Sequence, residues 1–248
     1  MKFNRKTFGI IIIGNEILSG KTQDTNSNLI CRELNKIGFV CKEIAVIGDD
    51  KKKISEKVNK FRKSFNFVFT TGGIGPTHDD MTSEAIANAF KEPLKLNNEA
   101  KSRIEKHYSD DVVTRARLKM AKLPAKAKLI DNPVSIAPGF FIENVYVLPG
   151  IPKILEVMLN DILKNFKSSK KFIKKIITTT LSEGVIGDYL ESVQKEFFDL
   201  EIGSYPYFKK NQFGVSLVIT GDSLKRVENA VKKINAYLES NNGEPRLF

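Results

Sequence analysis

The stretch that most constrains the fold lies at residues 65–84, where a short apolar run leads into glycines and then into a helix. The run is Phe67-Val68-Phe69, and Gly72, Gly73 and Gly75 follow it closely. Glycine lets backbone N–H groups approach an anion, and the positive end of a helix dipole attracts the same anion. This order of strand, glycine loop and helix is typical of α/β proteins that bind phosphate groups.

Polar residues complete this stretch before the helix that we expect over 84–90. Asp79 and Asp80 form an acidic pair, and Thr82 and Ser83 are good N-cap residues. The glycine spacing matches neither the dinucleotide fingerprint nor the P-loop, because no G-x-G-x-x-G and no Lys-Ser/Thr pair is present. A plainer interpretation therefore stays open, in which a glycine turn joins strand to helix and the acids are solvated capping groups.

The same order of elements occurs twice before this stretch. Residues 8–13 form a continuous apolar run, as in a central parallel strand, and it ends at the loop 14–20. A helix to about Ile37 follows, then a strand over 39–47 that ends in Gly48-Asp49-Asp50, and then a basic amphipathic helix. The repeated alternation predicts an α/β fold with a doubly wound, mostly parallel sheet.

This topology predicts that several acids meet at one edge of the sheet. The carboxyl ends of parallel strands share an edge, and ligands bind there. The three loops bring five carboxylates to that edge: Glu16, Asp49, Asp50, Asp79 and Asp80. Carboxylates that are crowded together repel one another unless a cation or proton offsets them. A metal here would have oxygen ligands, which favours magnesium or manganese over zinc. Each acid also has a structural explanation, since Asp50 is placed to N-cap the second helix.

The rest of the chain predicts a β-hairpin and then a second, smaller domain. Apolar residues on both sides of Glu143-Asn144 indicate the hairpin, and Pro152 suits the first turn of a helix. The polar stretch 167–171 indicates a linker, so we place the domain boundary between residues 1–168 and 169–248. The remaining expected elements are helices over 101–108, 111–120, 183–198 and 223–237, strands over 126–130, 172–181, 202–205 and 213–220, and a loose tail over 241–248.

Composition excludes several classes of protein. The chain is 41% hydrophobic and 28% charged, which is ordinary for a globular protein, and we expect no membrane span and no signal peptide. The net charge of +11 suits an anionic partner, but the lysines are spread over helix faces without an aromatic stacking platform. We therefore expect no nucleic-acid partner. Cys31 and Cys41 have no metal spacing and are interpreted as buried thiols in a reducing cytoplasm.

Several motifs together resemble the CinA-type (competence/damage-inducible protein A) branch of the molybdopterin-binding domain superfamily. They span most of the chain: GNEILSG at 14–20, DTN at 24–26, TGGIGPTHDDMT at 71–82, MAKLP at 120–124, NPV at 132–134, APGF at 137–140, VLPGIP at 147–152 and GSYP at 203–206. The resemblance implies a three-layer α/β/α fold for the first domain. Many CinA proteins carry a C-terminal amidase domain, and we do not expect that activity in this chain.

The resemblance implies a function in nucleotide or pterin chemistry. Members related to CinA are similar to metal-dependent pyrophosphatases that act on ADP-ribose, and eukaryotic relatives act on FAD. More distant relatives bind molybdopterin and adenylylate it, with acids that would fall on Asp80 and near Asp49. The leading expectation is a pyrophosphatase of the ADP-ribose or FAD class. The alternatives are a molybdopterin-binding or molybdopterin-adenylylating protein and a non-catalytic nucleotide-binding module.

These expectations assign roles to individual residues. We expect a divalent metal (Mg, Mn or Co), molybdopterin as an alternative ligand, and a homo-oligomer (dimer or trimer) in the cytoplasm. The acids take two roles: Asp80, Asp49 and Asp50 as catalytic residues, and Asp80, Asp79 and Glu16 as metal ligands. The substrate-binding set draws on the strand-end loops and one cation: Gly14, Glu16, Ser19, Gly20, Asn26, Thr71, Gly72, Gly73, Gly75, Pro76, Thr77, Arg117, Pro149 and Gly150. Lys119 is the alternative to Arg117 as the cation that faces the leaving phosphate.

Overall fold

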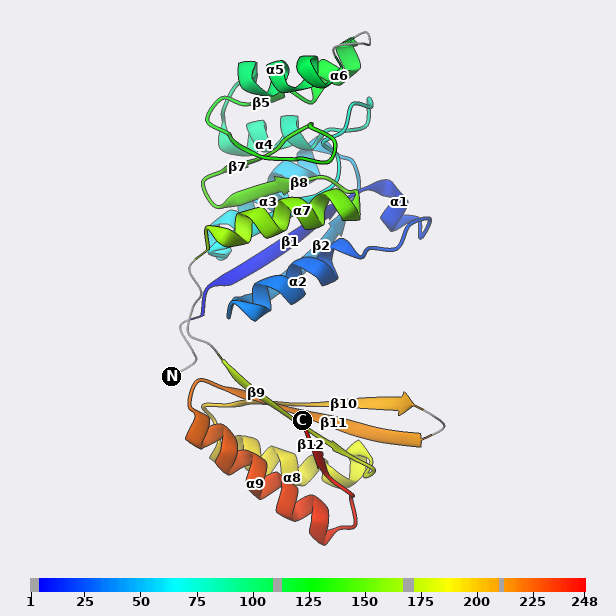
Figure 1. Ribbon diagram of the computed structural model, residues 1–248, viewed down its shortest axis with the longest axis vertical. Coiled ribbons are helices and arrows are strands. Elements are labelled where there is room, and N and C mark those ends of the chain that lie inside the picture. Colours follow the sequence, from blue (N-terminus) through cyan, green and yellow to red (C-terminus); the bar gives the residue numbers. More distant parts are fainter. Residues whose placement is uncertain (1–4, 109–112, 167–171, 210–211) are drawn as a thin grey trace. The chain divides into compact units, whose positions relative to one another are not determined.

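The computed structural model describes residues 5–108, 113–166, 172–209 and 212–248 of the chain (Figure 1). The chain divides into two compact units, one spanning Arg5–Ser169 and the other including Lys170–Phe248. Each unit encloses apolar clusters of its own. None of the helices in these described ranges is both long and apolar enough to cross a membrane.

The first unit alternates strands and helices. Its helices are α1 (Asn15–Leu18), α2 (Asn26–Lys36), α3 (Lys51–Ser64), α4 (Thr82–Phe90), α5 (Asn98–His107), α6 (Arg115–Lys119) and α7 (Pro152–Lys164). Its strands are β1 (Thr7–Ile13), β2 (Val40–Ile47), β3 (Phe67–Thr71), β4 (Leu94–Leu96), β5 (Lys122–Pro124), β6 (Lys128–Ile130), β7 (Gly139–Ile142) and β8 (Val145–Leu148).

Six of these strands form one sheet in the order β2-β1-β3-β8-β7-β6. The pairs β2/β1, β1/β3 and β3/β8 are parallel, and β7 pairs antiparallel with both of its neighbours. The predicted mostly parallel sheet and the hairpin around Glu143-Asn144 are therefore confirmed. Because β2 and β3 lie on opposite sides of β1, the winding reverses between β1 and β3, which is where ligands bind in open α/β sheets.

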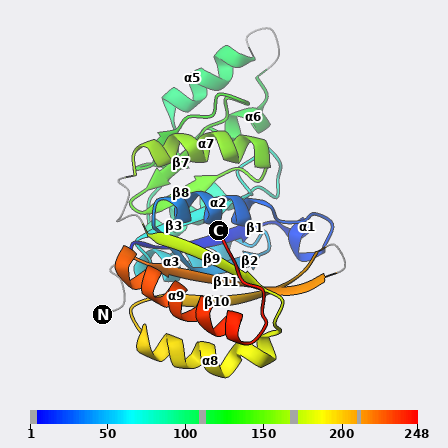
Figure 2. The same ribbon diagram turned by 60° about the horizontal axis from the view of Figure 1, so that its bottom comes forward.

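Both faces of this sheet are covered by helices, which gives the predicted three-layer arrangement. Residues of β1 point alternately to the two faces: Ile11 and Ile13 pack with α3 and α4, whereas Phe8, Ile10 and Ile12 pack with α2 and α7. This burial on both faces explains why the β1 sequence is apolar throughout rather than alternating. Figure 2 shows α2 and α7 lying along one face of the strands.

The region after α4 differs from the sequence-based expectation. β4 and β5 form a small antiparallel sheet that the periodicity does not indicate, because each strand has only three residues. The helix expected over 111–120 begins later, at Arg115, where the Thr114 side chain accepts a hydrogen bond from Arg117 N. The start of that expected helix, at 111 and 112, lies outside the described residues.

The second unit is an antiparallel sheet with helices on one face. Its elements are β9 (Ile173–Thr179), α8 (Glu183–Glu196), β10 (Glu201–Lys209), β11 (Gln212–Gly221), α9 (Leu224–Ser240) and β12 (Arg246–Leu247). The strand order is β10-β11-β9-β12. Both helices lie along one face of this sheet (Figures 1 and 2). Their side chains pack with inward-facing residues of β9 and β11. This small α+β arrangement is the predicted one.

The C-terminal segment is not the loose tail that its sequence predicts. β12 pairs with β9, and Phe248 exchanges two backbone hydrogen bonds with Ile176, at 2.8 and 3.1 Å. The buried Thr179 hydroxyl also donates to Gly243 O. Sequence periodicity misses this segment because a two-residue strand has no pattern, whereas backbone pairing with an existing sheet edge is enough to hold it.

Candidate functional site

The ends of β1 and β3 meet at Gly72, the first residue after β3. A Cβ atom at this position would lie 2.1 Å from Ile13 O, and the Gly72 φ angle is +99°. Both facts require glycine, since another residue would clash with the β1 backbone and adopt a strained conformation. Gly150, which follows β8, also lies against Gly72. The glycine loop therefore begins at the place where the winding of the sheet reverses.

Buried polar side chains hold this loop against the strand ends. The Thr82 hydroxyl donates to Gly72 O at 2.9 Å, and Thr82 N donates to Gly73 O at 2.9 Å. Thr82 is fully buried and is the first residue of α4, so its expected N-cap role is wrong. Ser83 lies within the helix too, and the N-cap position falls on Met81. The Thr82 side chain turns back toward the loop, which fixes the loop on α4.

Asn26, at the start of α2, ties two further strand ends together. Its side-chain amide donates to Thr71 Oγ1 at 2.8 Å and to Gly150 O at 2.7 Å, while the Thr71 hydroxyl donates to Pro149 O. Asn26 and Thr71 are both buried. A small cavity of about 70 Å³ lies beside them, and Glu16 and Gly72 also line it. These hydrogen bonds therefore fix Asn26, Thr71 and Gly150 relative to one another at the carboxyl edge of the sheet.

A larger cavity of about 560 Å³ lies between the glycine loop and α6. The loop contributes residues 74–78 and Asp80, and α4 contributes Ser83 and Glu84. The opposite side is basic, with Arg115, Lys119 and Lys122. The cavity therefore places a carboxylate and several cations around a space that is large enough for a phosphate-bearing ligand.

Two carboxylates converge on the Thr77 hydroxyl. Thr77 Oγ1 contacts both Asp79 Oδ1 and Asp80 Oδ2, and Thr77 N donates to Asp80 Oδ2 at 2.8 Å. A hydroxyl carries one proton and cannot donate fully to both acids, so the pair suits a bound cation. The Thr77 hydrogen bond lowers the pKa of Asp79, and the nearby charges of His78 and Lys119 add to the effect. Asp79 is therefore ionised at neutral pH.

The cation that contacts this loop is Lys119 rather than Arg117. Lys119 Nζ donates to Thr77 O and lies at the cavity wall. The Arg117 guanidinium instead lies over the Tyr108 ring, 3.8 Å from its centroid, and does not line the cavity. The two side chains point differently because residues two apart on a helix do not share a face. The substrate-binding role predicted for Arg117 is thus not supported by its position.

The remaining acids of the predicted cluster contact backbone at the starts of helices. Asp50 N-caps α3, since its side chain accepts from Lys53 N at 2.9 Å, and this hydrogen bond lowers the pKa of Asp50. Asp49 accepts a hydrogen bond from Asn15 N at 2.9 Å. The Glu16 carboxylate folds over Gly14, on the side of the small cavity. Asp49 and Asp50 therefore have structural roles that do not depend on a ligand.

The five acids do not assemble into one metal-binding group. In the part of the chain that the structure describes, no three His, Cys, Asp or Glu side chains are arranged to hold a metal ion. The expectation that Glu16 would join Asp79 and Asp80 as a metal ligand is therefore corrected. The reason is geometric, because the Glu16 carboxylate folds over Gly14 and lines the small cavity, whereas Asp80 lines the larger one. The two acids that the structure does bring together are Asp79 and Asp80, which both contact the Thr77 hydroxyl.

Only some of the residues predicted to form the site line one of these two cavities. Gly75, Pro76, Thr77 and Asp80 line the larger one, and Glu16, Asn26, Thr71, Gly72 and Gly150 line the smaller one. The linings do not include the other predicted residues, namely Gly14, Ser19, Gly20, Asp49, Asp50, Gly73, Asp79, Arg117 and Pro149. Ser83, Leu94, Arg115 and Lys122 also line the larger cavity, although the sequence did not predict them as site residues. Leu94, Arg115 and Lys122 belong to β4, α6 and β5, which only the tertiary fold brings beside the glycine loop.

The fold and this strand-end site define a molybdopterin-binding-type α/β/α domain. Residues 9–168 match the family described as "Probable molybdopterin binding domain", and the chain belongs to this family. Residues 171–244 match the "FAD synthase, middle domain". The predicted resemblance to CinA proteins is confirmed by a crystal structure of the protein CinA with unknown function from Thermoplasma acidophilum. That structure shares 36% identity, covers 64% of this chain and 98% of its own, and has a TM-score of 0.61.

Two relatives align over nearly the whole of this chain. A protein of Archaeoglobus fulgidus is 36% identical over 231 residues, which are 93% of this chain and 97% of the relative. A protein of Caenorhabditis elegans named "Probable FAD synthase" is 32% identical over 94% of this chain. The chain spans only half of that relative's length.

Proposed function

We propose that the chain is a metal-dependent pyrophosphatase that acts on a nucleotide diphosphate of the ADP-ribose or FAD class. The observation that carries this proposal is the cavity between the glycine loop and α6, which is lined by Asp80 and by the basic side chains Arg115, Lys119 and Lys122, while Asp79 contacts Thr77 of the same loop. A diphosphate needs both features, because its charge must be neutralised while a water molecule attacks one phosphorus. The FAD synthase name of the Caenorhabditis elegans relative is consistent with a dinucleotide ligand.

The loop residues would bind the phosphates and orient the reaction. Glycine at position 75 leaves room beside the Asp80 carboxylate, since a Cβ there would lie 2.7 Å from Asp80 Oδ2. Asp79 and Asp80 would hold a divalent ion (Mg, Mn or Co), which supplies charge neutralisation and a more acidic water. Lys119 and Arg115 would stabilise the leaving phosphate. The water oxygen bonds to one phosphorus, the bond to the bridging oxygen breaks, and AMP and a second phosphate monoester are released.

A second candidate is adenylyl transfer at the same site. Here the attacking group is a phosphate oxygen of FMN or of molybdopterin instead of water. It bonds to the α-phosphorus of ATP, the bond from that phosphorus to the bridging oxygen breaks, and pyrophosphate leaves. The names of the matched family and of the FAD synthase relatives favour this candidate. The two reactions need the same phosphate contacts and differ in which nucleophile enters the cavity.

A panel of substrates separates these reactions. The full chain would be incubated with ADP-ribose or FAD, and separately with ATP plus FMN or a pterin phosphate, with and without Mg²⁺, Mn²⁺ or Co²⁺. AMP release from the diphosphates that requires metal supports the pyrophosphatase. Formation of FAD or of an adenylylated pterin supports the transferase. Heat stabilisation by a nucleotide without either product would support a non-catalytic module and reject both enzymes.

Asp80→Asn is the variant that tests the assigned chemistry. We expect at least about a 100-fold loss of kcat/KM for AMP release, the scale of losing one electrostatic catalytic group. Asp161→Asn is the matched control, because it removes the same charge at a half-exposed position in α7, where Asp161 pairs with Lys164. Circular dichroism would establish that both variants are folded. Equal turnover in the two variants would reject the role of Asp80.

A further inference from the structure

The sheet of the second unit has a cavity on the face opposite α8 and α9. The helices pack against the face that carries Ile177 and Leu217 (Figures 1 and 2). Because side chains alternate along a strand, Thr178 and Ser216 lie on the other face. The cavity there has a volume of about 760 Å³, and residues of all four strands line it. The motif GSYP at 203–206, which has no role in the strand-end site, contributes to this lining.

Four of the lining residues form a row across the sheet. Ser216 of β11 is paired with Tyr205 of β10 on one side and with Thr178 of β9 on the other. Thr178 is paired in turn with Arg246 of β12. Neighbouring strands lie about 4.8 Å apart, so the backbone positions of Tyr205 and Arg246 are about 14 Å apart. The row therefore presents an aromatic ring, two hydroxyls and a guanidinium, in that order.

Two glycines support the tyrosine rings at the aromatic end of the row. A Cβ atom at Gly203 would lie 2.9 Å from Cε2 of Tyr205, and a Cβ atom at Gly214 would lie 2.6 Å from Cζ of Tyr207. Each ring thus rests on backbone that a larger residue would cover. The Tyr205 side chain nevertheless stays 58% exposed. The sheet therefore holds this ring and leaves part of its surface for another flat ring to stack on.

The basic end of the row has an arginine that can bind an anion. The ion pairs of the second unit, within its described residues, join Lys195, Arg226 and Lys233 to acids and do not include the exposed Arg246. A guanidinium can donate two parallel hydrogen bonds to one phosphate group. Glu244 also lines the cavity, and its carboxylate can accept hydrogen bonds from hydroxyl groups of a ligand.

We propose that this face of the second unit binds a mononucleotide, which is a flat ring joined through a sugar or polyol to a phosphate. The ring stacks on Tyr205, and the phosphate accepts hydrogen bonds from Arg246 at the other end of the row. The hydroxyls of Thr178 and Ser216 contact the sugar or polyol between them. The cavity volume is in the range of small-molecule sites. This site is separate from the reaction at the strand-end loops and does not depend on it.

The charge of the second unit favours a mononucleotide over a nucleic-acid strand. Residues 170–248 hold 12 Lys and Arg against 10 Asp and Glu. A strand needs a basic groove along its whole backbone, whereas one phosphate needs one well-placed cation. An apolar protein surface is also a poor partner, because it would bury the two hydroxyls and the guanidinium of the row without hydrogen bonds.

Isothermal titration calorimetry of the full chain with FMN and with AMP tests the proposal. EDTA would be present, so that no divalent metal supports binding at the strand-end site. Riboflavin and adenosine, which lack the phosphate, should bind at least about fivefold more weakly than FMN and AMP. Of FMN and AMP, the one that binds more tightly identifies the ring and linker that fit the row. Absence of binding by both at millimolar concentration would overturn the proposal.

Variants of the row locate the binding. Tyr205→Ala should weaken FMN and AMP binding at least about fivefold, the lower end for a base stacked on an aromatic side chain, whereas Tyr205→Phe should retain it. Arg246→Gln should weaken FMN binding to the level of riboflavin and leave riboflavin binding unchanged. Arg32→Gln is the matched control, because it removes the same charge from the first unit.

Three results of these titrations would overturn the proposal. The first is an unchanged affinity for FMN and AMP in both Tyr205→Ala and Arg246→Gln, which would assign the binding to another part of the chain. The second is tighter binding of a ten-residue oligothymidylate than of either mononucleotide. The third is a dimer, measured by sedimentation, that Tyr205→Ala dissociates and that FMN and AMP do not, which would assign this face to a second copy of the chain.

Discussion

Glycines of the two units occupy positions of opposite kinds. In the first unit, Gly72 touches the β1 backbone and has a positive φ angle, so the site geometry requires glycine there. In the second unit, Gly184 and Gly187 lie in α8, and a Cβ at either position would meet nothing within 4 Å. Glycine in a helix interior weakens the helix without any gain in packing. The close approach of two backbones therefore requires glycine at position 72, whereas no packing contact requires it at positions 184 and 187.

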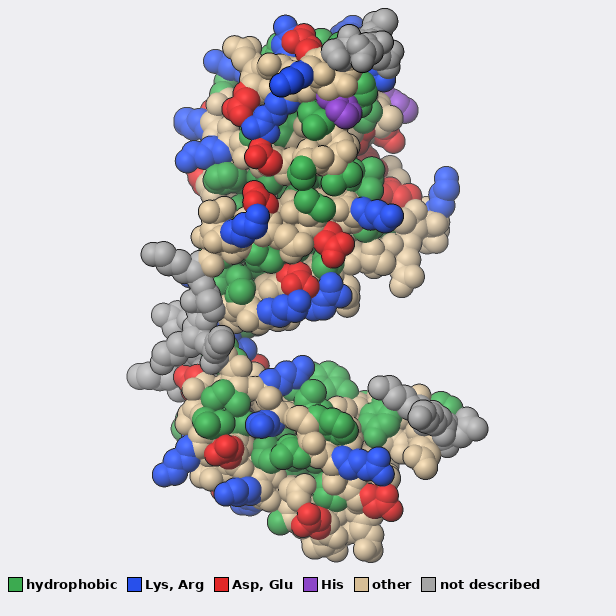
Figure 3. All heavy atoms as spheres, in the orientation of Figure 1, with side chains coloured by type: hydrophobic (Ala, Val, Ile, Leu, Met, Phe, Trp, Pro, Cys, Tyr) green, Lys and Arg blue, Asp and Glu red, His purple; other side chains and the backbone are tan. Residues whose placement is uncertain are grey.

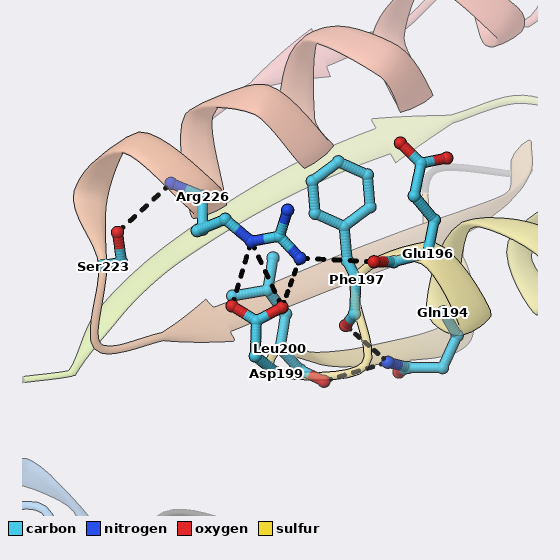
Figure 4. Close-up of polar contacts among 7 residues, drawn as sticks. All are labelled: Gln194, Glu196, Phe197, Asp199, Leu200, Ser223 and Arg226. Atoms are coloured by element: carbon cyan, nitrogen blue, oxygen red, sulfur yellow. Dashed lines mark hydrogen bonds and ion pairs between the residues drawn. The ribbon is translucent and has the colours of Figure 1, made fainter. Parts of the chain in front are cut away.

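The charged groups of the two units also differ, in whether each one faces a partner of opposite charge. The acids of the glycine loop converge on Thr77 at the wall of a cavity. In the second unit, Arg226 forms a two-pronged ion pair with Asp199 and stacks over Phe197, which joins α9 to the end of α8 (Figure 4). Paired opposite charges of this kind satisfy each other, whereas neighbouring carboxylates repel one another and favour a nearby positive charge, which Lys119 supplies in part at the glycine loop.

The surfaces of the two units do not differ in how their charged side chains are distributed. In Figure 3, basic and acidic side chains are interspersed over the visible face of each unit. Ion pairs such as Lys51–Glu84 and Arg103–Asp131 account for part of this mixture. The net charge of +11 is therefore a weaker guide to ligands than the local group of cations on and beside α6.

The largest expected effect on stability comes from Gly72→Ala. The new Cβ would clash with Ile13 O and adopt a strained φ angle, so we expect the free energy of unfolding to fall by about 3 kcal/mol or more. Urea denaturation followed by circular dichroism would measure the change. Gly187→Ala is the matched control and should raise stability by about 0.5–1 kcal/mol. If Gly72→Ala and Gly187→Ala changed the free energy of unfolding by similar amounts, the packing at position 72 would not be what requires glycine there.

Asn26→Ala should have an intermediate effect. It removes the donors to Thr71 Oγ1, which is buried, and to Gly150 O, which is partly buried, so we expect a loss of about 1–3 kcal/mol and weaker nucleotide binding. Asn144→Ala is the matched control, because its amide also donates to two backbone oxygens, at the opposite ends of the strands. Asn144 is half-buried, so water replaces part of what it loses. Calorimetric binding that weakens equally in both variants would contradict a site-specific role for Asn26.

Asp199→Asn should have the smallest effect, and the effect should depend on pH. The Arg226 hydrogen bond lowers the pKa of Asp199, so its stabilisation is present above the unfolded aspartate pKa of about 3.9 and is lost as pH falls through the lower folded value. We expect a decrease of a few degrees or less in Tm at pH 7, because the pair is partly exposed. The difference between variant and wild type should shrink below pH 4. A constant difference across that range would show that the ion pair is not its cause.

The sequence determined the layers, the strand-end glycine loop and the family of this protein. Apolar runs such as 8–13 predict buried parallel strands, and glycines at 72–75 predict a loop that approaches an anion, because both signals are local. Tertiary structure alone decided which polar groups share a cavity. In the folded chain Lys119 contacts the glycine loop, whereas Arg117 lies over the Tyr108 ring. Asp49 and Asp50 accept hydrogen bonds from backbone N–H groups at the starts of helices, and Glu16 lines a separate cavity. The tertiary structure also paired the C-terminal segment with β9. These outcomes depend on distances between chain segments, and no local pattern encodes such distances.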